Sequence, residues 1–219
     1  VARINPFEVL EQHKNSVTFV QRSDENTKRD FPFDYELKIK YTINGDTVTN
    51  EYTVTNTGED KLPFVIGGHP AFNCPLAKNE KFEDYKVVFD KNITKPCLRP
   101  DHHTGLVNVF EKFDEMHGGD TLSLVHELFE EKDALIFENC EAKSATLIGK
   151  SGKGVKIEFQ DMNNLLIWSA VGNAPFVALE PWTGLASCND EDGLFEHKRG
   201  MTVLEKDETA SFKFKITMI

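Results

Sequence analysis

Alternation of polar and apolar side chains dominates this sequence and constrains its fold more than any other feature. Residues 35–43 read YELKIKYTI, in which every second side chain is apolar. A period of two is the pattern of a β-strand with one buried face. The next residues, Asn44-Gly45-Asp46, are a strong hairpin signal, and alternation resumes over 47–55. We therefore predict an antiparallel hairpin over this stretch.

The same pattern recurs along the rest of the chain. The strands that it predicts cover 85–89, 134–137, 145–148, 155–159, 165–169, 176–179 and 210–219. A helical pattern is confined to 121–131, and no internal repeat or Pro/Gly-rich linker divides the sequence. Many short strands without a linker predict one all-β domain over 1–219, built as a large sandwich or a barrel.

Composition narrows the function more than the fold. The 219 residues carry a formal net charge of −11, which disfavours nucleic acid and anionic membranes because phosphate groups would be repelled. No apolar run approaches the roughly 18 residues of a membrane span, and the first residues do not resemble a secretory signal. The cysteines fit neither a zinc motif nor a dense disulfide framework. We therefore expect a cytoplasmic protein whose cysteines are reduced. These cysteines are Cys74, Cys97, Cys140 and Cys188.

The first segment that could carry chemistry is Gly67-Gly68-His69-Pro70. Two glycines allow the backbone to turn tightly or to approach a ligand closely, and Pro70 favours an extended conformation at His69. We therefore expect the imidazole to lie at the end of a strand, on a backbone segment of restricted conformation. Such a histidine could be a general acid or base, although a histidine beside glycines is more often a simple turn residue.

The second segment covers 177–184, where an apolar run ends in Glu180 and continues into Pro181 and Trp182. Burying an unpaired carboxylate is costly, so Glu180 needs a partner or a function. An aromatic ring beside a carboxylate is common in sugar sites, where the ring covers the apolar face of the sugar. The alternative interpretation is a salt-bridged glutamate at the end of a strand.

Other candidates are weaker. His102-His103 lies in a polar segment that is more typical of a solvated loop than of a metal site, and Trp168 is predicted to be a core residue of its strand. The sequence contains no GxGxxG, GxxxxGK[ST], GxSxG or HExxH motif. This absence argues against dinucleotide enzymes, P-loop enzymes, nucleophile-elbow hydrolases and zincin proteases.

The two unusual segments together resemble a known family. GGHPAFNCPL at 67–76 and ALEPWTG at 178–184 are similar to motifs of the galactose mutarotase-like superfamily, and most similar to its bacterial LacX-like aldose 1-epimerase homologues. The resemblance extends through 1–9, 41–73 and 126–159 and therefore covers nearly the whole chain. It implies a large antiparallel β-sandwich with a sugar-binding cleft on one face. The family also carries several tens of residues, ending in His-Gly, before the position of Val1, so the resemblance implies a sandwich without its N-terminal strands.

The resemblance also implies roles for individual residues. His69 matches the family's general acid and Glu180 its general base. Arg3 matches an arginine near the sugar, and Trp182 is expected to contact the substrate. Asp133 matches an aspartate that binds sugar hydroxyls, with Glu138 as a competing candidate for that role.

The function that we expect is therefore that of an aldose 1-epimerase, which interconverts the α and β anomers of a hexose. This chemistry needs no metal and no cofactor, and the expected partner is a small-molecule sugar bound by a monomer or homodimer. Two alternatives share the fold: a non-catalytic sugar-binding protein, and a hexose-phosphate 1-epimerase in which Arg3 and Arg99 would bind the phosphate. A glycoside hydrolase is less favoured, because it usually needs two facing carboxylates.

Overall fold

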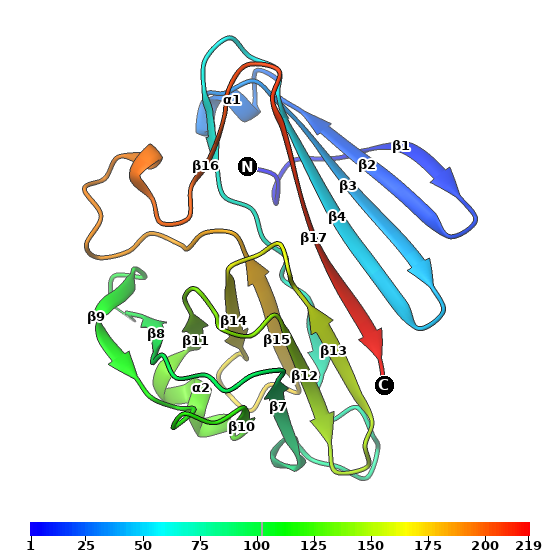
Figure 1. Ribbon diagram of the computed structural model, residues 1–219, viewed down its shortest axis with the longest axis vertical. Helices are drawn as coiled ribbons and strands as arrows, with labels where there is room; N and C mark the ends of the chain where they lie inside the picture. Colours follow the sequence, from blue (N-terminus) through cyan, green and yellow to red (C-terminus); the bar gives the residue numbers. More distant parts are fainter. Residues whose placement is uncertain (102) are drawn as a thin grey trace.

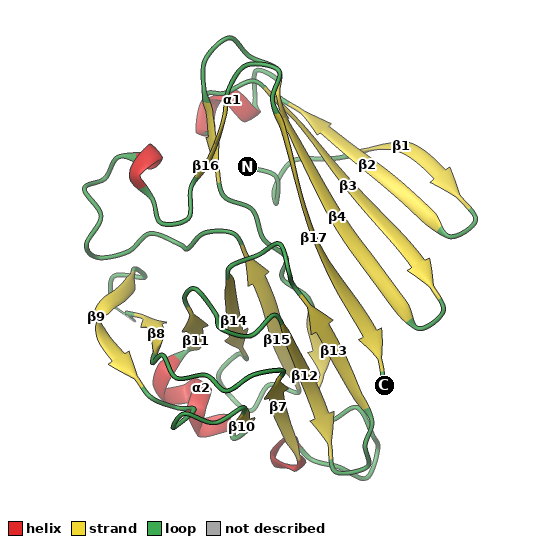
Figure 2. Cartoon of the chain, in the orientation of Figure 1, coloured by secondary structure: helices red, strands yellow, loops and turns green. Residues whose placement is uncertain are grey.

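The computed structural model of the chain describes residues 1–101 and 103–219. His102, half of the weak His102-His103 candidate, lies outside the described residues. Figure 1 shows that strands are the dominant regular structure, and Figure 2 shows the few short helical segments between them. The sequence-based prediction of an all-β protein is confirmed.

The larger sheet has nine antiparallel strands in the order β1-β2-β3-β4-β17-β13-β12-β7-β10. Its strands are β1 (Glu8–His13), β2 (Ser16–Arg22), β3 (Tyr35–Asn44), β4 (Thr47–Asn56), β7 (Tyr85–Phe89), β10 (Thr121–Ser123), β12 (Ser144–Gly149), β13 (Gly154–Glu158) and β17 (Thr209–Met218). The predicted hairpin is confirmed, because β3 and β4 pair along their whole length and Asn44 faces Thr47 at the turn.

The smaller sheet has six strands in the order β6-β15-β14-β11-β8-β9. Its strands are β6 (Ala71–Asn73), β8 (Cys97–Pro100), β9 (Val107–Phe113), β11 (Ala134–Phe137), β14 (Asn164–Trp168) and β15 (Phe176–Trp182). A separate pair joins β5 (Leu62–Phe64) to β16 (Thr202–Leu204). The helical segments are α1 (Thr27–Asp30), α2 (His126–Lys132), η1 (Phe82–Asp84) and η2 (Phe195–His197).

The main hydrophobic core lies between the two sheets. Phe89 of β7 packs against Phe137 of β11 with ring centroids 5.2 Å apart. Leu147 of β12 is fully buried in the same cluster as Leu165 of β14 and Leu179 of β15. Because side chains alternate along a strand, the even-numbered residues of β14 and β15 point to the opposite face of the smaller sheet, and that face carries the candidate site.

Two sequence-based expectations are refined in this fold. The weak helical signal within 121–131 corresponds to α2, which begins at His126 and precedes β11, and β10 takes the first residues of that stretch. The strand predicted at 176–179 continues to Trp182, so Glu180 lies inside β15 and not at its end. Several strands that the alternation did not indicate are short, exposed or irregular, among them β1, β5, β6, β8 and β16, and the longer β2 was also missed.

The four cysteines are buried free thiols, as expected from their spacing. Burial raises the pKa of Cys74 to about 12 and those of Cys97 and Cys140 to about 11. High thiol pKa values and burial make these side chains unreactive. No helix within the described residues is long and apolar enough to cross a membrane.

Truncation of a side chain between the two sheets tests this arrangement. We expect Leu147→Ala to lower the free energy of unfolding by about 2–5 kcal/mol, because it removes buried apolar surface and leaves a cavity. The matched control is Val171→Ala, at an exposed loop position, where a change within about 0.5 kcal/mol is expected. Urea unfolding of both variants measures the two values, and equal effects would contradict the assignment of the core.

Candidate functional site

The segment that contains His69 runs antiparallel to β15. Gly67 forms a bridge with Trp182, and Ala71 of β6 pairs with Ala178 in the same register. The backbone N–H of Gly68 donates to the carbonyl of Pro181 at 3.0 Å, and Leu179 N–H donates to the Pro70 carbonyl at 3.1 Å. This register places His69 opposite Glu180, so backbone pairing brings together the two segments that the sequence singled out.

Both glycines before His69 are required by close packing. A Cβ atom on Gly67 would lie 2.3 Å from Cδ1 of Trp182, and one on Gly68 would lie 2.6 Å from Cε1 of Phe214. Contacts this short do not occur between real atoms. The glycines thus allow the His69 segment to lie directly against the indole of Trp182 and the ring of Phe214, and neither has a positive φ that a tight turn would explain.

Glu180 is a buried carboxyl group without a hydrogen-bond partner among the described residues. Its side chain is 1% exposed, and neither carboxyl oxygen accepts a hydrogen bond. Nε2 of His69 lies 3.2 Å from Oε1 of Glu180, but the contact lacks the alignment of a hydrogen bond. Burial raises the pKa of Glu180 to about 8.

His69 and Glu180 line one cavity of about 300 Å³. The His69 side chain is 59% exposed, so the pair connects a buried carboxyl group to the surface. Trp182 forms part of the wall, and its indole Nε1–H donates to the Gly68 carbonyl at 3.2 Å. The lining residues are Val65, Ile66, Gly67, Gly68, His69, Glu180, Trp182, Gly184, Leu185 and Ala186. They include no lysine and no arginine.

Asp133 is connected to this site through Trp168. Its Oδ1 accepts a hydrogen bond of 2.9 Å from Nε1 of Trp168. The Trp168 indole in turn packs against the His69 ring at right angles, with centroids 5.7 Å apart. The sequence predicted Trp168 to be a core residue, but it is half-buried and belongs to the face that carries Glu180.

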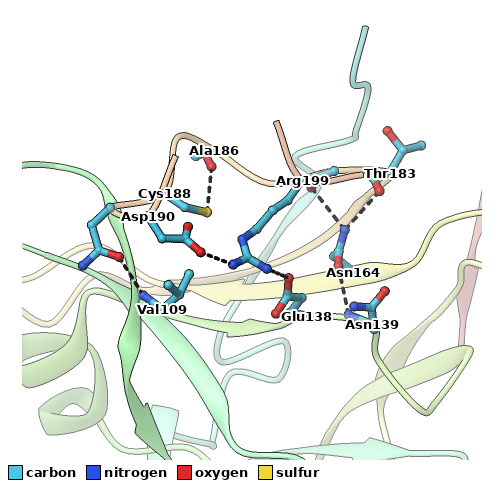
Figure 3. Close-up of polar contacts among 11 residues, drawn as sticks. Val109, Glu138, Asn139, Asn164, Thr183, Ala186, Cys188, Asp190 and Arg199 are labelled. Atoms are coloured by element: carbon cyan, nitrogen blue, oxygen red, sulfur yellow. Dashed lines mark hydrogen bonds and ion pairs between the residues drawn. The ribbon is translucent and has the colours of Figure 1, made fainter. Parts of the chain in front are cut away.

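Glu138, the competing candidate for the role of Asp133, is held by a cation. Figure 3 shows the guanidinium of Arg199 between Glu138 and Asp190. Nη1 of Arg199 donates to Oε1 of Glu138 at 3.1 Å, and Nη2 donates to Oδ2 of Asp190. These contacts tie the loop after β15 to the end of β11.

Asn164 fixes the other end of the same loop. Its Nδ2 lies within 3.2 Å of the carbonyls of Thr183 and Gly184, and its Oδ1 accepts the Asn139 N–H at 3.0 Å (Figure 3). Asn164 is buried at the first position of β14. Sequence reasoning missed it, because one polar residue before an apolar run is a common strand boundary.

The arginines that were considered for substrate binding differ in their surroundings. Arg3 is exposed and does not line the cavity of His69 and Glu180. Arg99 is engaged elsewhere: it donates to Glu111 at 3.2 Å and lies 4.6 Å from the centroid of the Phe113 ring. Within the described residues, no group of three or more His, Cys, Asp or Glu side chains could hold a metal ion.

The structure thus brings together His69, Glu180 and Trp182 in one cavity, and joins Asp133 to them through Trp168. A buried acid or base beside an exposed imidazole can move a proton to and from a bound hydroxyl group. The unfilled hydrogen-bonding capacity of Glu180 is available to a ligand that offers a donor.

Comparisons with known proteins agree in pointing to one family. A family model described as aldose 1-epimerase matches residues 1–217. The plasmid form of protein LacX from Lactococcus lactis subsp. lactis is 35% identical over 221 residues, which cover 99% of this chain and 73% of that protein.

Two solved structures are also similar. A galactose mutarotase related enzyme from Lactobacillus acidophilus has a TM-score of 0.91 at 27% identity, over 100% of this chain and 72% of that chain. A galactose mutarotase-like protein from Lactobacillus casei ATCC 334 has a TM-score of 0.86 at 29% identity, over 100% of this chain and 74% of that chain. These relatives support the large antiparallel sandwich that the sequence predicted.

The buried carboxyl group makes stability depend on pH. The pKa of Glu180 is about 8 in the folded chain against an ordinary value of 4.5, so the folded state binds this proton more tightly than the unfolded state. The favourable effect is complete below pH 4.5 and is lost as the pH rises to 8. We expect the free energy of unfolding of Glu180→Gln to exceed that of the original chain by an amount that grows by about 3 kcal/mol as the pH rises from 5 to 9.

Urea unfolding across this pH range measures the difference. Glu127→Gln is the matched control, because Glu127 is an exposed residue of α2. The control is expected to follow the pH dependence of the original chain. A difference between Glu180→Gln and the original chain that stays constant with pH would contradict the raised pKa.

Proposed function

Because the chain belongs to the aldose 1-epimerase family, we propose that it interconverts the α and β anomers of a hexose by acid–base opening of the sugar ring. The observation that carries this proposal is the buried carboxyl group of Glu180, which faces His69 across 3.2 Å in a cavity and has no hydrogen-bond partner among the described residues. A sugar hydroxyl group would supply the missing donor.

Anomer exchange requires two proton transfers. Glu180 takes the proton from the hydroxyl group on C1 while the bond between C1 and the ring oxygen breaks. The electron pair of that bond goes to the ring oxygen, which receives a proton from His69. The open aldehyde rotates about C1–C2, and the ring closes on the other face of C1 with the two proton transfers reversed.

The environment of Glu180 suits this exchange of roles. A general acid or base works best when its pKa lies near the working pH, and burial raises the pKa of Glu180 to about 8. Such a group accepts and returns a proton at similar cost near neutral pH. His69 complements it, because its ring is open to solvent on a strand segment fixed by backbone pairing to β15.

Further residues are proposed to hold the sugar. Trp182 offers an apolar ring in the cavity wall, suited to the C–H face of a hexose. Asp133 and Arg3 remain predicted sugar-binding residues. Asp133 is the better candidate of the two acids. Its Oδ1 accepts a hydrogen bond from the neutral indole of Trp168, whereas Glu138 is held by the positively charged Arg199.

The alternatives are less well supported. A sugar-binding protein without catalysis would have no use for a buried carboxyl group of raised pKa beside a histidine. A hexose-phosphate enzyme would need lysine or arginine side chains in the cavity, yet the lining contains neither. Arg3 does not line the cavity, and Arg99 is paired with Glu111. In a glycoside hydrolase a second carboxylate would have to face Glu180, and Glu138 is neutralised by Arg199.

Removal of either proton-transfer group tests the mechanism. We expect Glu180→Gln and His69→Asn each to slow anomer exchange by about 10²–10⁴-fold while the fold is retained, because each loses one proton transfer. Polarimetry on freshly dissolved α-D-glucose and α-D-galactose measures the rate and ranks the two sugars.

The control for this experiment is Glu127→Gln, which changes an exposed carboxylate of α2 and should leave the rate unchanged. A folded Glu180→Gln protein with full activity would refute the assignment of the base. An original chain that binds hexose in calorimetry but does not accelerate exchange would favour the binding-protein alternative.

The absence of cations from the cavity lining leads to a second expectation. A free hexose should react with a kcat/KM at least about tenfold above that of its 6-phosphate, because an unpaired phosphate in this cavity would lose its hydration without compensation. Exchange NMR between the anomers measures both substrates. A preference for the phosphate would overturn the choice of a neutral sugar in favour of the hexose-phosphate alternative.

A further inference from the structure

Trp168 lies in contact with both Asp133 and His69. Its indole Nε1–H donates a hydrogen bond of 2.9 Å to Oδ1 of Asp133. The same indole packs against the His69 imidazole with ring centroids 5.7 Å apart and an interplanar angle of 83°. The three side chains form one contact chain, and it ends where Nε2 of His69 lies 3.2 Å from Oε1 of Glu180.

The backbone of Asp133 has a conformation that an aspartate rarely adopts. Its φ is 60° and its ψ is −70° at the position that ends α2, where its N–H donates to the Phe129 carbonyl at 2.9 Å. Glycine adopts positive φ values at the least cost. Strained residues other than glycine persist where their surroundings require the side chain, and the hydrogen bond to Trp168 provides such a requirement.

The imidazole of His69 has few restraints of its own. More than half of its side chain is exposed, and its contact with Glu180 is not aligned as a hydrogen bond. The Trp168 ring is therefore a principal restraint on the orientation of the imidazole. Trp168 is itself supported by Phe176, with ring centroids 5.4 Å apart, and by the Asp133 carboxylate.

We propose that Asp133 and Trp168 are positioning residues: Asp133 fixes the indole of Trp168, and the indole holds the His69 ring so that Nε2 faces Glu180. This inference rests on the proposed function, since the orientation matters to catalysis only if a proton moves through His69. It assigns Asp133 a positioning role in place of the sugar-binding role that the family resemblance implies. The two roles differ in their consequences, because only the positioning role lowers turnover without raising KM.

Kinetics of three variants test the proposal. Asp133→Gly removes the carboxylate at a backbone position that glycine tolerates, and Trp168→Phe removes the indole N–H. We expect each to lower kcat about tenfold and to change KM by less than about twofold, because a small misorientation of a catalytic group mainly affects the transition state. Asp133→Asn keeps a carbonyl acceptor for the indole and should restore kcat to within about threefold of the original.

A matched control is available at Asp207. This residue also has a positive φ, of 62°, and is exposed in the turn before β17. Asp207→Gly therefore makes the same chemical change at a residue of similar φ, and it is expected to leave kcat and KM unchanged. If Asp133→Gly fails to fold, Trp168→Phe and Asp133→Asn carry the same comparison.

A double-mutant cycle separates positioning from direct sugar binding. If Asp133 acts through Trp168, Asp133→Gly has no further effect on kcat in the Trp168→Phe background. If Asp133 binds the sugar directly, its removal raises KM in both backgrounds and the two effects multiply. The second result would overturn the proposal.

NMR provides a readout that does not depend on activity. The chain has two tryptophans, so Trp168→Phe identifies the indole N–H resonance of Trp168 by its loss. Asp133→Gly should shift this resonance and those of the His69 ring, and Asp207→Gly should shift neither. An indole shift without a change at His69 would refute the contact chain. An original chain without anomer exchange would refute the proposed function, and the ring shifts would still decide the structural part.

Discussion

The buried carboxyl group of Glu180 is the constraint on which the candidate site depends. An ionised carboxylate in an apolar interior is unfavourable by several kcal/mol unless it is paired, and no hydrogen bond of the described residues satisfies this one. The group is tolerated because it remains protonated over much of the neutral range, as its raised pKa indicates. It sits in the middle of β15, where β14 pairs with it on one side and the His69 segment on the other.

Pairing of the His69 segment with β15 explains how two distant parts of the sequence meet. The bridge between Gly67 and Trp182 and the ladder from Ala71 to Ala178 share one register. A slip of one residue would turn His69 to the other face of the sheet. The register is locked by packing, because only glycine fits at position 67 against the Trp182 indole. The glycine motif can therefore be recognised in the sequence, whereas the structure is needed to explain it, because the explanation is the contact between position 67 and Trp182 of β15.

The sequence predicted the fold class and those strands in which polar and apolar residues alternate regularly. It did not predict elements whose conformation depends on contacts with distant parts of the chain. The hairpin of β3 and β4 carries its own turn signal and was found; β5 and β6 are three residues long and exist only through their partners. His69 and Glu180 stood out because they interrupt apolar patterns. Trp168 fits its apolar strand, so no local signal distinguished a tryptophan in the core from one beside the imidazole. The positive φ of Asp133 likewise has no signature in its residue type.

The two faces of the smaller sheet have different roles: one packs into the core and the other carries the candidate site. Leu165, Leu179 and their neighbours on one face fill the core between the sheets, and this burial is what allows the other face to hold a group that destabilises the fold. Proteins commonly accept such a loss of stability at functional sites. A site built on central strands also keeps its geometry better than one built on loops, and Glu180, on β15, is held in this way. The side chain of His69 is by comparison the exposed member of the pair. For that reason the orientation of the imidazole needs support from β14, and Trp168 is the side chain of that strand in contact with it.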